Sequence, residues 1–295
     1  MNIFIGLKTT SYTPEAYAYR DFFEARGHKV LLAPEAEVPP SNIDVTIKFL
    51  GLQPFWTSSA RKDKHILVHE YHSLSTPPYA HLKNFVKSII NTKPDMRIFL
   101  SKQVEDEFSF RKGRVPTVHR DMGVDPIFFN SSTTEKEFDL VYCGSYRPGL
   151  DATLLKLGAL GAKILVIGHM PKETEALLSP VPSITLTGKV RNDEVPSLIK
   201  QARLGLNFMP NVYPYNMQTS TKVLEYCAAG LGVVSTNYAW AKLFEAKEKA
   251  RFIWLEQVSS IEDLYSPTII PDMSNYTWEK IIESSRLLEA LEALF

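Results

Sequence analysis

The sequence is short of several features that mark particular classes of protein. Its 295 residues include only two cysteines, Cys143 and Cys227. Both lie in apolar surroundings, which argues against a disulfide framework and for a reducing compartment. No C-x-x-C pair or dense His/Cys group occurs, so no metal site is expected. Basic and acidic residues number 33 each, and this charge balance excludes a broad electrostatic nucleic-acid binder.

Long apolar runs are also missing. No stretch approaches the roughly 18 consecutive apolar residues of a transmembrane helix. The apolar run at residues 1–6 is too short for a signal peptide, and no basic segment precedes it. We therefore expect a cytoplasmic protein that at most rests on a membrane surface.

Short apolar runs alternate with helical patterns twice along the chain. The first half predicts strands at 2–7, 29–33, 44–49, 65–69, 97–100 and 117–119, and helices at 14–27, 80–90 and 102–110. The second half predicts strands at 138–143, 163–167, 184–186, 204–208 and 232–235, and helices at 151–160, 193–202 and 221–229. Such alternation favours an α/β protein with two doubly wound, Rossmann-like parallel sheets. Ligands of such sheets bind outside the carboxyl ends of the strands, here in a cleft between the two domains.

The pattern also predicts domain boundaries. The N-terminal domain is expected at 1–130, a linker at 131–137, the C-terminal domain at 138–275 and a C-terminal helix at 276–295. The linker is inferred from the polar run that precedes Phe138. Apolar residues at helical spacing in the last segment predict a core-facing helix, which we expect to return to the N-terminal domain.

The stretch 220–235 carries the most informative chemistry. If Ser220 or Thr221 caps a helix, Lys222 lies in its first turn, where a cation opposes the helix dipole unless an anion binds there. Glu225 lies three residues further along on the same face. A carboxylate beside an anion site is placed to accept from the two hydroxyls of a ribose, so the spacing indicates a nucleotide site. A solvated surface pair of Lys222 and Glu225 is the open alternative.

This stretch resembles the ribose-binding helix of GT-B glycosyltransferases, especially the retaining family 4 (glycosyl transferases group 1). Three further elements resemble that family in the same order: Asp-Met-Gly-Val-Asp-Pro-Ile-Phe at 121–128, Cys-Gly-Ser-Tyr-Arg at 143–147, and Gly-Lys-Val at 188–190 followed by Glu-Val-Pro-Ser-Leu at 194–198. The resemblance spans about residues 97–236. It implies the transfer of a sugar from a nucleotide-diphosphate sugar, based on UDP or GDP, to an acceptor hydroxyl on a glycan, a lipid-linked molecule or a small molecule. It also implies retention of configuration, no metal, and no cofactor besides the nucleotide sugar as co-substrate.

The resemblance implies a role for each matching residue of the nucleotide site. Arg147 and Lys222 would bind the donor diphosphate, together with Ser220 and Thr221. Glu225 would hold the ribose. Guanidinium and ammonium groups neutralise a leaving diphosphate through charge-assisted hydrogen bonds.

Further roles fall on two loops. Lys189 and Val190 would meet the base. The family often has a glutamate eight positions before the ribose glutamate, and here that position is Met217. The loop of Asn216, Met217 and Gln218 therefore lacks that carboxylate, and its backbone and amides would hold the donor sugar.

The N-terminal half offers candidate catalytic residues at the end of a predicted strand. His69 and Glu70 resemble a His-Asp pair that relatives often carry near this point, and His72 is the next candidate. A strand end that faces the cleft is a suitable place for an acid, a base or an orienting group. Hydrogen-bonded structural histidines are the open alternative.

Two further segments are weaker candidates. Gly6, Lys8 and Thr9 follow the first strand and would approach the donor phosphate or the acceptor. Basic residues gather at 61–64 and at 83–97, the second group mixed with apolar side chains. A solvated helix face is the favoured interpretation of that second group, and a face that meets a membrane or a lipid-linked acceptor stays open.

Two other classes of function stay open beside a glycosyltransferase. One is a nucleotide-sugar epimerase of the same fold, which would need further carboxylates that the sequence does not single out. The other is a module that binds a nucleotide or glycan without turnover, which the departure at Met217 keeps open.

Overall fold

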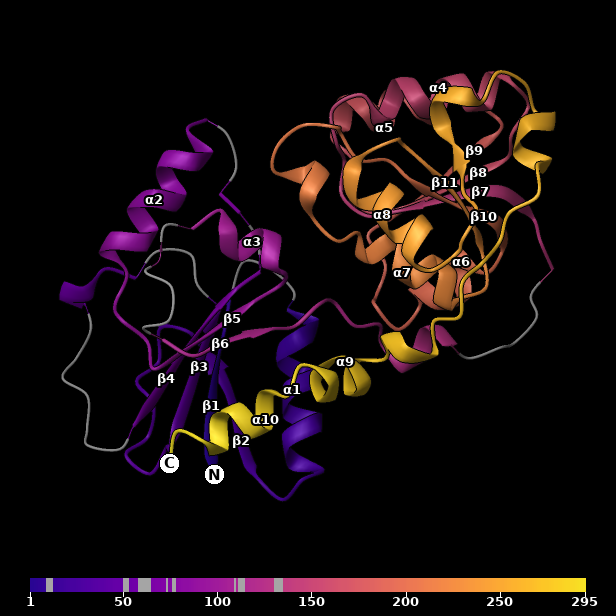
Figure 1. Cartoon of the computed structure of the whole chain (residues 1–295). Coiled ribbons are helices and arrows are strands. Elements are labelled where there is room, and N and C mark those ends of the chain that lie inside the picture. The colour runs from indigo at the N-terminus through magenta and orange to yellow at the C-terminus, as the bar shows by residue number, and fades with distance from the viewer. Residues whose placement is uncertain are drawn as a thin grey trace. The chain divides into compact units, whose positions relative to one another are not determined.

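The computed structural model describes residues 1–8, 13–49, 53–57, 65–72, 74–75, 78–108, 110, 115–129 and 135–295. The chain forms two compact units, Met1–Gly123 with Thr277–Phe295, and Val124–Tyr276 (Figure 1). The predicted linker 131–137 is described only from residue 135, and the basic residues expected at 61–64 lie outside the described residues.

The first unit is built on a parallel sheet with the strand order β2-β1-β3-β4-β5-β6. Its strands are β1 (Asn2–Leu7), β2 (Lys29–Pro34), β3 (Val45–Phe49), β4 (Ile66–Tyr71), β5 (Met96–Phe99) and β6 (Thr117–His119). Its helices are α1 (Pro14–Glu24), α2 (Ala80–Ile90) and α3 (Lys102–Asp106), with a 3-10 turn η1 (Phe55–Thr57) and the terminal helices α9 (Trp278–Ser284) and α10 (Leu287–Glu292). The chain reverses its winding direction between β1 and β3, and this switch point is where such sheets bind ligands.

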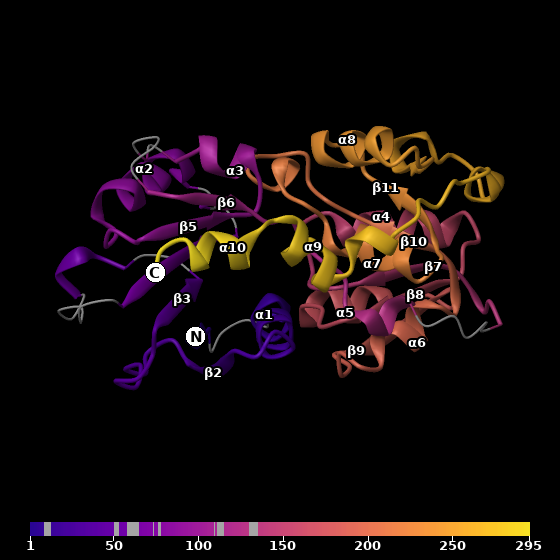
Figure 2. The same cartoon turned by 60° about the horizontal axis from the view of Figure 1, so that its bottom comes forward.

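The terminal helices complete the core of the first unit. Ile282, Leu287 and Leu291 are fully buried in the same apolar cluster as β1, β3, β4 and α1. Figure 1 and Figure 2 both show α9 and α10, in yellow, beside elements of the first unit. The predicted return of the C-terminal segment is therefore confirmed. The single helix expected there is broken in two, because Arg286 adopts a left-handed conformation with φ of 56°.

The second unit is also a parallel sheet, with the order β12-β11-β10-β7-β8-β9. Its strands are β7 (Phe138–Cys143), β8 (Ile164–Ile167), β9 (Ile184–Gly188), β10 (Ala202–Asn207), β11 (Gly232–Ser235) and β12 (Ile253–Trp254). Its helices are α4 (Leu150–Ala159), α5 (Lys172–Leu178), α6 (Val195–Ile199), α7 (Thr221–Ala228) and α8 (Ala239–Lys247), with 3-10 turns η2 (Pro126–Phe129), η3 (Tyr215–Met217), η4 (Leu255–Gln257), η5 (Glu262–Tyr265) and η6 (Ser274–Tyr276). Numbered within the unit, this is the strand order of the dinucleotide-binding fold, with its switch point between β7 and β10.

The expected α/β class with two doubly wound parallel sheets is confirmed. Three short elements of the second unit, α5, α8 and β12, are not predicted by the sequence pattern. Helix α5 buries only Thr174 and Leu178, and α8 buries only Ala241 and Phe244. Two buried residues do not make a periodic apolar stripe, so neither helix leaves a clear signal. No described helix has the length and apolar character to cross a bilayer.

Candidate functional site

Helix α7 begins beside the switch point between β7 and β10, and a buried polar network fixes its start. Ser220 is the N-cap, yet its hydroxyl accepts no bond from the first-turn amides. It donates instead to Asn207 Oδ1 at 2.8 Å. The amide of Asn207 donates to Ser235 Oγ at 2.8 Å and to the hydroxyl of Tyr238 at 3.2 Å. The first turn of α7 is therefore held in place without a side-chain cap on its N–H groups.

Lys222 lies in this first turn and fits against a glycine at the end of β7. Gly144 has a φ of 140°, and a Cβ added there would come within 2.5 Å of Lys222 Cε and 2.9 Å of Nζ. Gly168, which follows β8, packs so closely that a Cβ would collide with the carbonyl oxygen of Gly144. The ammonium also lies 5.7 Å from the ring centre of Tyr142. Two glycines at adjacent strand ends thus make the space that Lys222 fills.

Arg147 is a second cation near Lys222, in the loop between β7 and α4. Its guanidinium carbon lies 5.2 Å from the ring centre of Tyr215. Burial lowers the pKa of Lys222, and the charge of Arg147 lowers it further against the opposing effect of Glu225. Two like charges are therefore held together in a partly desolvated place, where a bound anion would relieve their repulsion.

Glu225 lies one turn further along α7. Burial raises its pKa to about 7, the charge of Lys222 opposes this rise, and Asp125 adds to it. Asp125 directly precedes η2, which packs against α7. Within the described part of the chain, no hydrogen bond or ion pair involves the carboxylate of Glu225. Both Lys222 and Glu225 are half-buried, so they do not form the solvated surface pair that the spacing alone leaves open.

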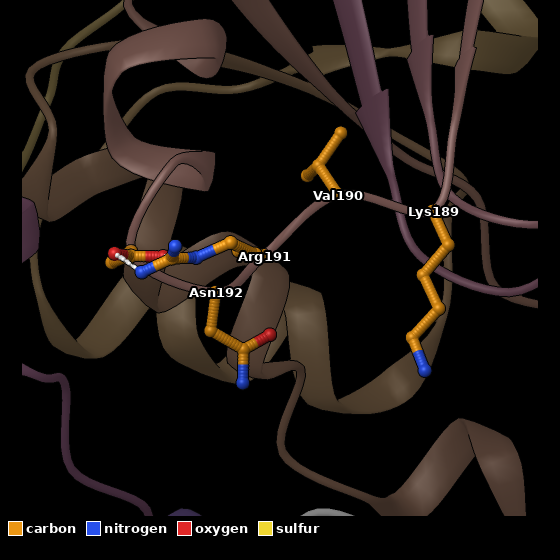
Figure 3. A pocket seen from close by; sticks show the side chains of 5 residues that line it. Lys189, Val190, Arg191 and Asn192 are labelled. Carbon is orange, nitrogen blue, oxygen red and sulfur yellow. Dashed lines mark hydrogen bonds and ion pairs between the residues drawn. The ribbon is translucent and has the colours of Figure 1, made fainter.

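Lys189 and Val190 follow the edge strand β9 and line an open pocket. Arg191, Asn192 and Asp193 complete its lining (Figure 3). Arg191 is held by Asp193 through two hydrogen bonds of 3.0 and 2.6 Å. In Figure 3 the side chains of Lys189 and Asn192 extend to one side and Val190 points to the other. The loop therefore presents hydrogen-bonding groups on one side and an apolar side chain on the other.

The loop of Asn216, Met217 and Gln218 forms η3 and the residue after it. All three side chains are half-buried. The amide nitrogen of Asn216 donates to Asn211 Oδ1 at 3.3 Å, and its buried Oδ1 has no hydrogen-bond partner among the described residues. Met217 offers a thioether where the family often has a carboxylate.

In the first unit, His72 lies between two carboxylates directly after β4. Its Nδ1 is 2.6 Å from Glu15 Oε1, and its Nε2 is 2.5 Å from Glu70 Oε1. Arg120 Nη2 also lies 3.1 Å from His72 Nε2, so the ring is held from both sides by charged neighbours. Burial would raise the pKa of Glu15, but the hydrogen bond and charge of His72, with the charge of Arg120, outweigh it and lower that pKa.

Arg120 follows β6 and closes this cluster. Its Nη2 donates to Glu70 Oε1, and its Nε donates to the hydroxyl of Tyr19 at 2.8 Å. The guanidinium carbon lies 5.3 Å from the ring centre of Tyr19 and 5.2 Å from that of Trp278. Both ionic side chains, Arg120 and Glu70, are fully buried. Arg120 and Glu70 therefore form a buried ion pair, while Glu15 Oε2 and Glu70 Oε2 are buried with no hydrogen-bond partner among the described residues.

The structure brings Glu70 and His72 together and leaves His69 apart from them. His69 is buried on the opposite face of β4, because side chains alternate along a strand. Gly6 lies inside β1 rather than in the loop after it, and Lys8 follows the last strand residue. Thr9 lies outside the described residues.

Five residues of these two clusters have no role assigned from the sequence: Glu15, Tyr19, Arg120, Asp125 and Asn207. Arg120 directly precedes a motif that the sequence does single out, and Asn207 lies near the end of a predicted strand. Those positions are the only signals that they carry. Their contacts depend on which strand ends meet, which spacing along one element does not reveal.

The two cysteines are unpaired, and the described residues contain no candidate metal site. Neither Cys143 nor Cys227 forms a disulfide, and burial raises the pKa of both thiols to about 12. In the part of the chain that the structure describes, no group of three or more His, Cys, Asp or Glu residues is placed to hold a metal ion.

The two sheets define the class of protein: two Rossmann-like domains, as in GT-B glycosyltransferases. A glycosyltransferase involved in avilamycin A biosynthesis is similar, with a TM-score of 0.63 and 14% identity over 99% of this chain and 97% of that one. A UDP-N-acetylglucosamine 2-epimerase from Rickettsia bellii has a TM-score of 0.53 and 11% identity, covering 99% and 95%. The T4 phage BGT mutant in complex with UDP-glucose has a TM-score of 0.50 and 16% identity, covering 100% and 97%. At these identities the likeness shows the fold alone.

The second unit carries a more particular signal. Residues 137–265 match the family model of Glycosyl transferases group 1. This range contains Arg147, Lys189, Lys222 and Glu225, which are the residues that the resemblance assigns to the donor nucleotide. No curated protein matches this chain.

Proposed function

We propose that this chain is a glycosyltransferase that moves a sugar from a nucleotide-diphosphate sugar to an acceptor hydroxyl. The match of residues 137–265 to Glycosyl transferases group 1 supports this class. The observation that carries the proposal is the charge arrangement at the start of α7. Two neighbouring cations, Arg147 and Lys222, lie beside the carboxylate of Glu225, whose pKa burial raises to about 7.

In this proposal Arg147 and Lys222 bind the diphosphate, with Ser220 and Thr221 at the start of the helix. The first-turn N–H groups of α7 have no side-chain cap, so they are placed to donate to phosphate oxygens. As the glycosidic bond to the diphosphate breaks, these donors stabilise the negative charge of the leaving group. We propose that the two cations take the part of a metal ion, and that the nucleotide sugar is the sole co-substrate.

The remaining parts of the donor fall to neighbouring loops. Glu225 in its ionised form accepts from the ribose hydroxyls, and Lys189 and Val190 meet the base of UDP or GDP. Asn216 and Gln218 hold sugar hydroxyls, with Met217 in the place of the family glutamate. We propose retention of configuration, which the coupling constant of the anomeric proton in the product would test.

We assign acceptor binding to the first unit. Both nitrogens of His72 are already bonded to carboxylates, so His72 and Glu70 suit an orienting role better than proton abstraction. The two unpaired thiols suit a reducing compartment, and we propose that the reaction takes place in the cytoplasm.

Calorimetry with UDP and GDP tests the nucleotide site. Lys222→Ala and Glu225→Ala should each weaken nucleoside diphosphate binding by about 1–3 kcal/mol, because each removes a charged hydrogen bond. Lys163→Ala and Glu262→Ala are matched controls, since both side chains are exposed and Lys163 precedes the amino end of β8. Unchanged affinity in both site variants, with melting curves like those of the controls, would refute the site.

Product analysis separates the three classes of function. The proposal predicts free nucleoside diphosphate together with a glycosylated acceptor. A nucleotide sugar that changes only its configuration would instead show an epimerase. Binding without turnover across a panel of UDP and GDP sugars and hydroxyl acceptors would show a binding module.

A further inference from the structure

We propose that one face of the first unit docks on an anionic lipid bilayer. This face, called the α2 face below, consists of Leu82, Phe85 and Ile89 of α2 with Phe55 and Trp56 of η1. The inference concerns lipid binding alone, so it stands or falls independently of sugar transfer.

The apolar stripe of α2 points away from the protein. Leu82, Phe85 and Ile89 recur at helical spacing, a pattern that normally faces a core. Here they are 58%, 49% and 61% exposed, while the residues that α2 buries are Ala80 and Asn84. The helix therefore presents its most apolar side outward.

The buried amide of Asn84 fixes this orientation. Its Oδ1 accepts a hydrogen bond from the backbone N–H of Ser75 at 3.0 Å. Rotation of α2 to bury the apolar stripe would break this bond and expose the side-chain amide of Asn84. It would also leave the buried backbone N–H of Ser75 without its acceptor, which is costly. The outward stripe is thus a consequence of the way in which the helix is anchored.

Phe55 and Trp56 extend the apolar surface beyond the end of α2. They are 61% and 64% exposed, and their rings meet edge to face with centroids 4.9 Å apart. The chain just before them is tied to the end of α2, since Gln53 N–H donates to Asn91 Oδ1 at 2.8 Å and Thr92 N–H donates to the Gln53 carbonyl at 2.9 Å. An exposed tryptophan beside apolar residues is typical of surfaces that enter the interfacial region of a bilayer.

The positive charge on and near α2 favours an anionic bilayer over a second protein copy as the partner of this face. Residues 79–94 contain three lysines and no acidic residue. Burial lowers the pKa of Lys87, and the nearby charges of Lys8 and Lys83 lower it further. The ammonium groups of Lys8, Lys83 and Lys87 therefore lie near one another. Cations beside an apolar stripe attract anionic headgroups while the stripe enters the acyl boundary. A symmetric dimer through this face would instead bring the lysines of two copies together.

Sedimentation of the full chain with vesicles tests the proposal. The protein should bind vesicles of phosphatidylcholine with phosphatidylglycerol, and bind phosphatidylcholine alone at least about tenfold more weakly. The double variant Leu82→Ser, Phe85→Ser should lose at least about tenfold in partitioning because it removes apolar contact. Leu243→Ser is the matched control, since Leu243 on α8 is 57% exposed. Lys83→Gln with Lys87→Gln should reduce binding to the anionic vesicles by more than about tenfold.

The fluorescence of Trp56 locates the contact on the protein. Its emission should shift to shorter wavelength on anionic vesicles, and Trp56→Phe should abolish that shift while most of the binding remains. The proposal is overturned if the wild type ignores anionic vesicles, or if the serine and glutamine variants bind as it does. It is equally overturned if sedimentation without lipid shows a self-association that Leu82→Ser, Phe85→Ser abolishes.

Discussion

Buried charged side chains are paired differently in the two units. In the first unit, Glu15, Glu70, His72 and Arg120 neutralise one another through short contacts between fully or largely buried groups. In the second unit, Lys222 and Glu225 are half-buried with no ion pair between them. The charged groups near Lys222 include a second cation, Arg147. The first cluster pairs opposite charges, although Glu15 Oε2 and Glu70 Oε2 are buried there with no hydrogen-bond partner among the described residues. The second holds two cations close to each other.

This difference is the reason why we propose the second cluster, and not the first, as the nucleotide-binding site. A buried pair of opposite charges resists separation, because an unpaired charge is costly in a poorly solvated place. An unpaired set of like charges destabilises the protein alone and gains free energy when an anion arrives. Stability measurements on the isolated protein should therefore separate the two clusters in both magnitude and sign.

The largest expected effect comes from removing the cation of the paired cluster. Arg120→Met removes the guanidinium from the fully buried Glu70, leaving His72 as its neighbour, and should cost about 3–5 kcal/mol. Hydrogen exchange of the β1 and β4 amides in urea would localise this loss to the first unit. Arg191→Met is the control, because Arg191 and Asp193 form an exposed ion pair worth at most about 1 kcal/mol. Equal effects of both variants would remove the distinction between the clusters.

A smaller effect of the opposite sign is expected at Glu225. Its folded pKa of about 7 exceeds its ordinary value of 4.5, so ionisation opposes folding above about pH 7 and this cost fades as the pH falls toward 5. Glu225→Gln should therefore stabilise the protein at pH 8 by about 1–3 kcal/mol, and by less at pH 5. Thermal melts at the two pH values measure this, with the exposed Glu262→Gln as control. A variant that is less stable than wild type at pH 8 would contradict the interpretation.

The smallest effect concerns Glu15 in acid. Its pKa is lowered in the folded state, so its contribution to stability is present above its ordinary pKa and is lost as the pH falls through the lowered value. Glu15→Gln should cost about 1 kcal/mol at pH 7, and this difference should shrink steadily as the pH falls below the ordinary pKa of a glutamate. Urea midpoints across this range test the prediction, with the exposed Glu24→Gln on the same helix as the reference. A constant difference at every pH would show a packing effect alone.

Sequence reasoning reaches furthest where one element carries the whole signal. Apolar runs predict the strands, and the spacing of Lys222 and Glu225 places both on one helix face, as the structure shows. The spacing of residues along one element cannot predict the paired cluster of the first unit, since Arg120 is 50 residues from Glu70 and 101 from Tyr19. Only the meeting of separate strand ends brings those side chains together.

Orientation is the second gap between sequence and structure. The stripe of Leu82, Phe85 and Ile89 is visible in the sequence, and the favoured interpretation of that segment is a solvated basic face. The structure shows an outward apolar face, set by the anchoring of Asn84 beneath the helix. A periodic pattern indicates that a face exists, but the direction in which it points depends on what the opposite side of the helix binds.

The return of α9 and α10 to the first unit has a consequence for biosynthesis. The second unit is one continuous segment, Val124–Tyr276, whereas the first needs residues from both ends of the chain. During translation the middle of the polypeptide can reach its final structure while the opening segment still lacks Ile282, Leu287 and Leu291, which its interior buries. The part made first is thus the part finished last, because its interior stays incomplete until the residues of α9 and α10 have been synthesised.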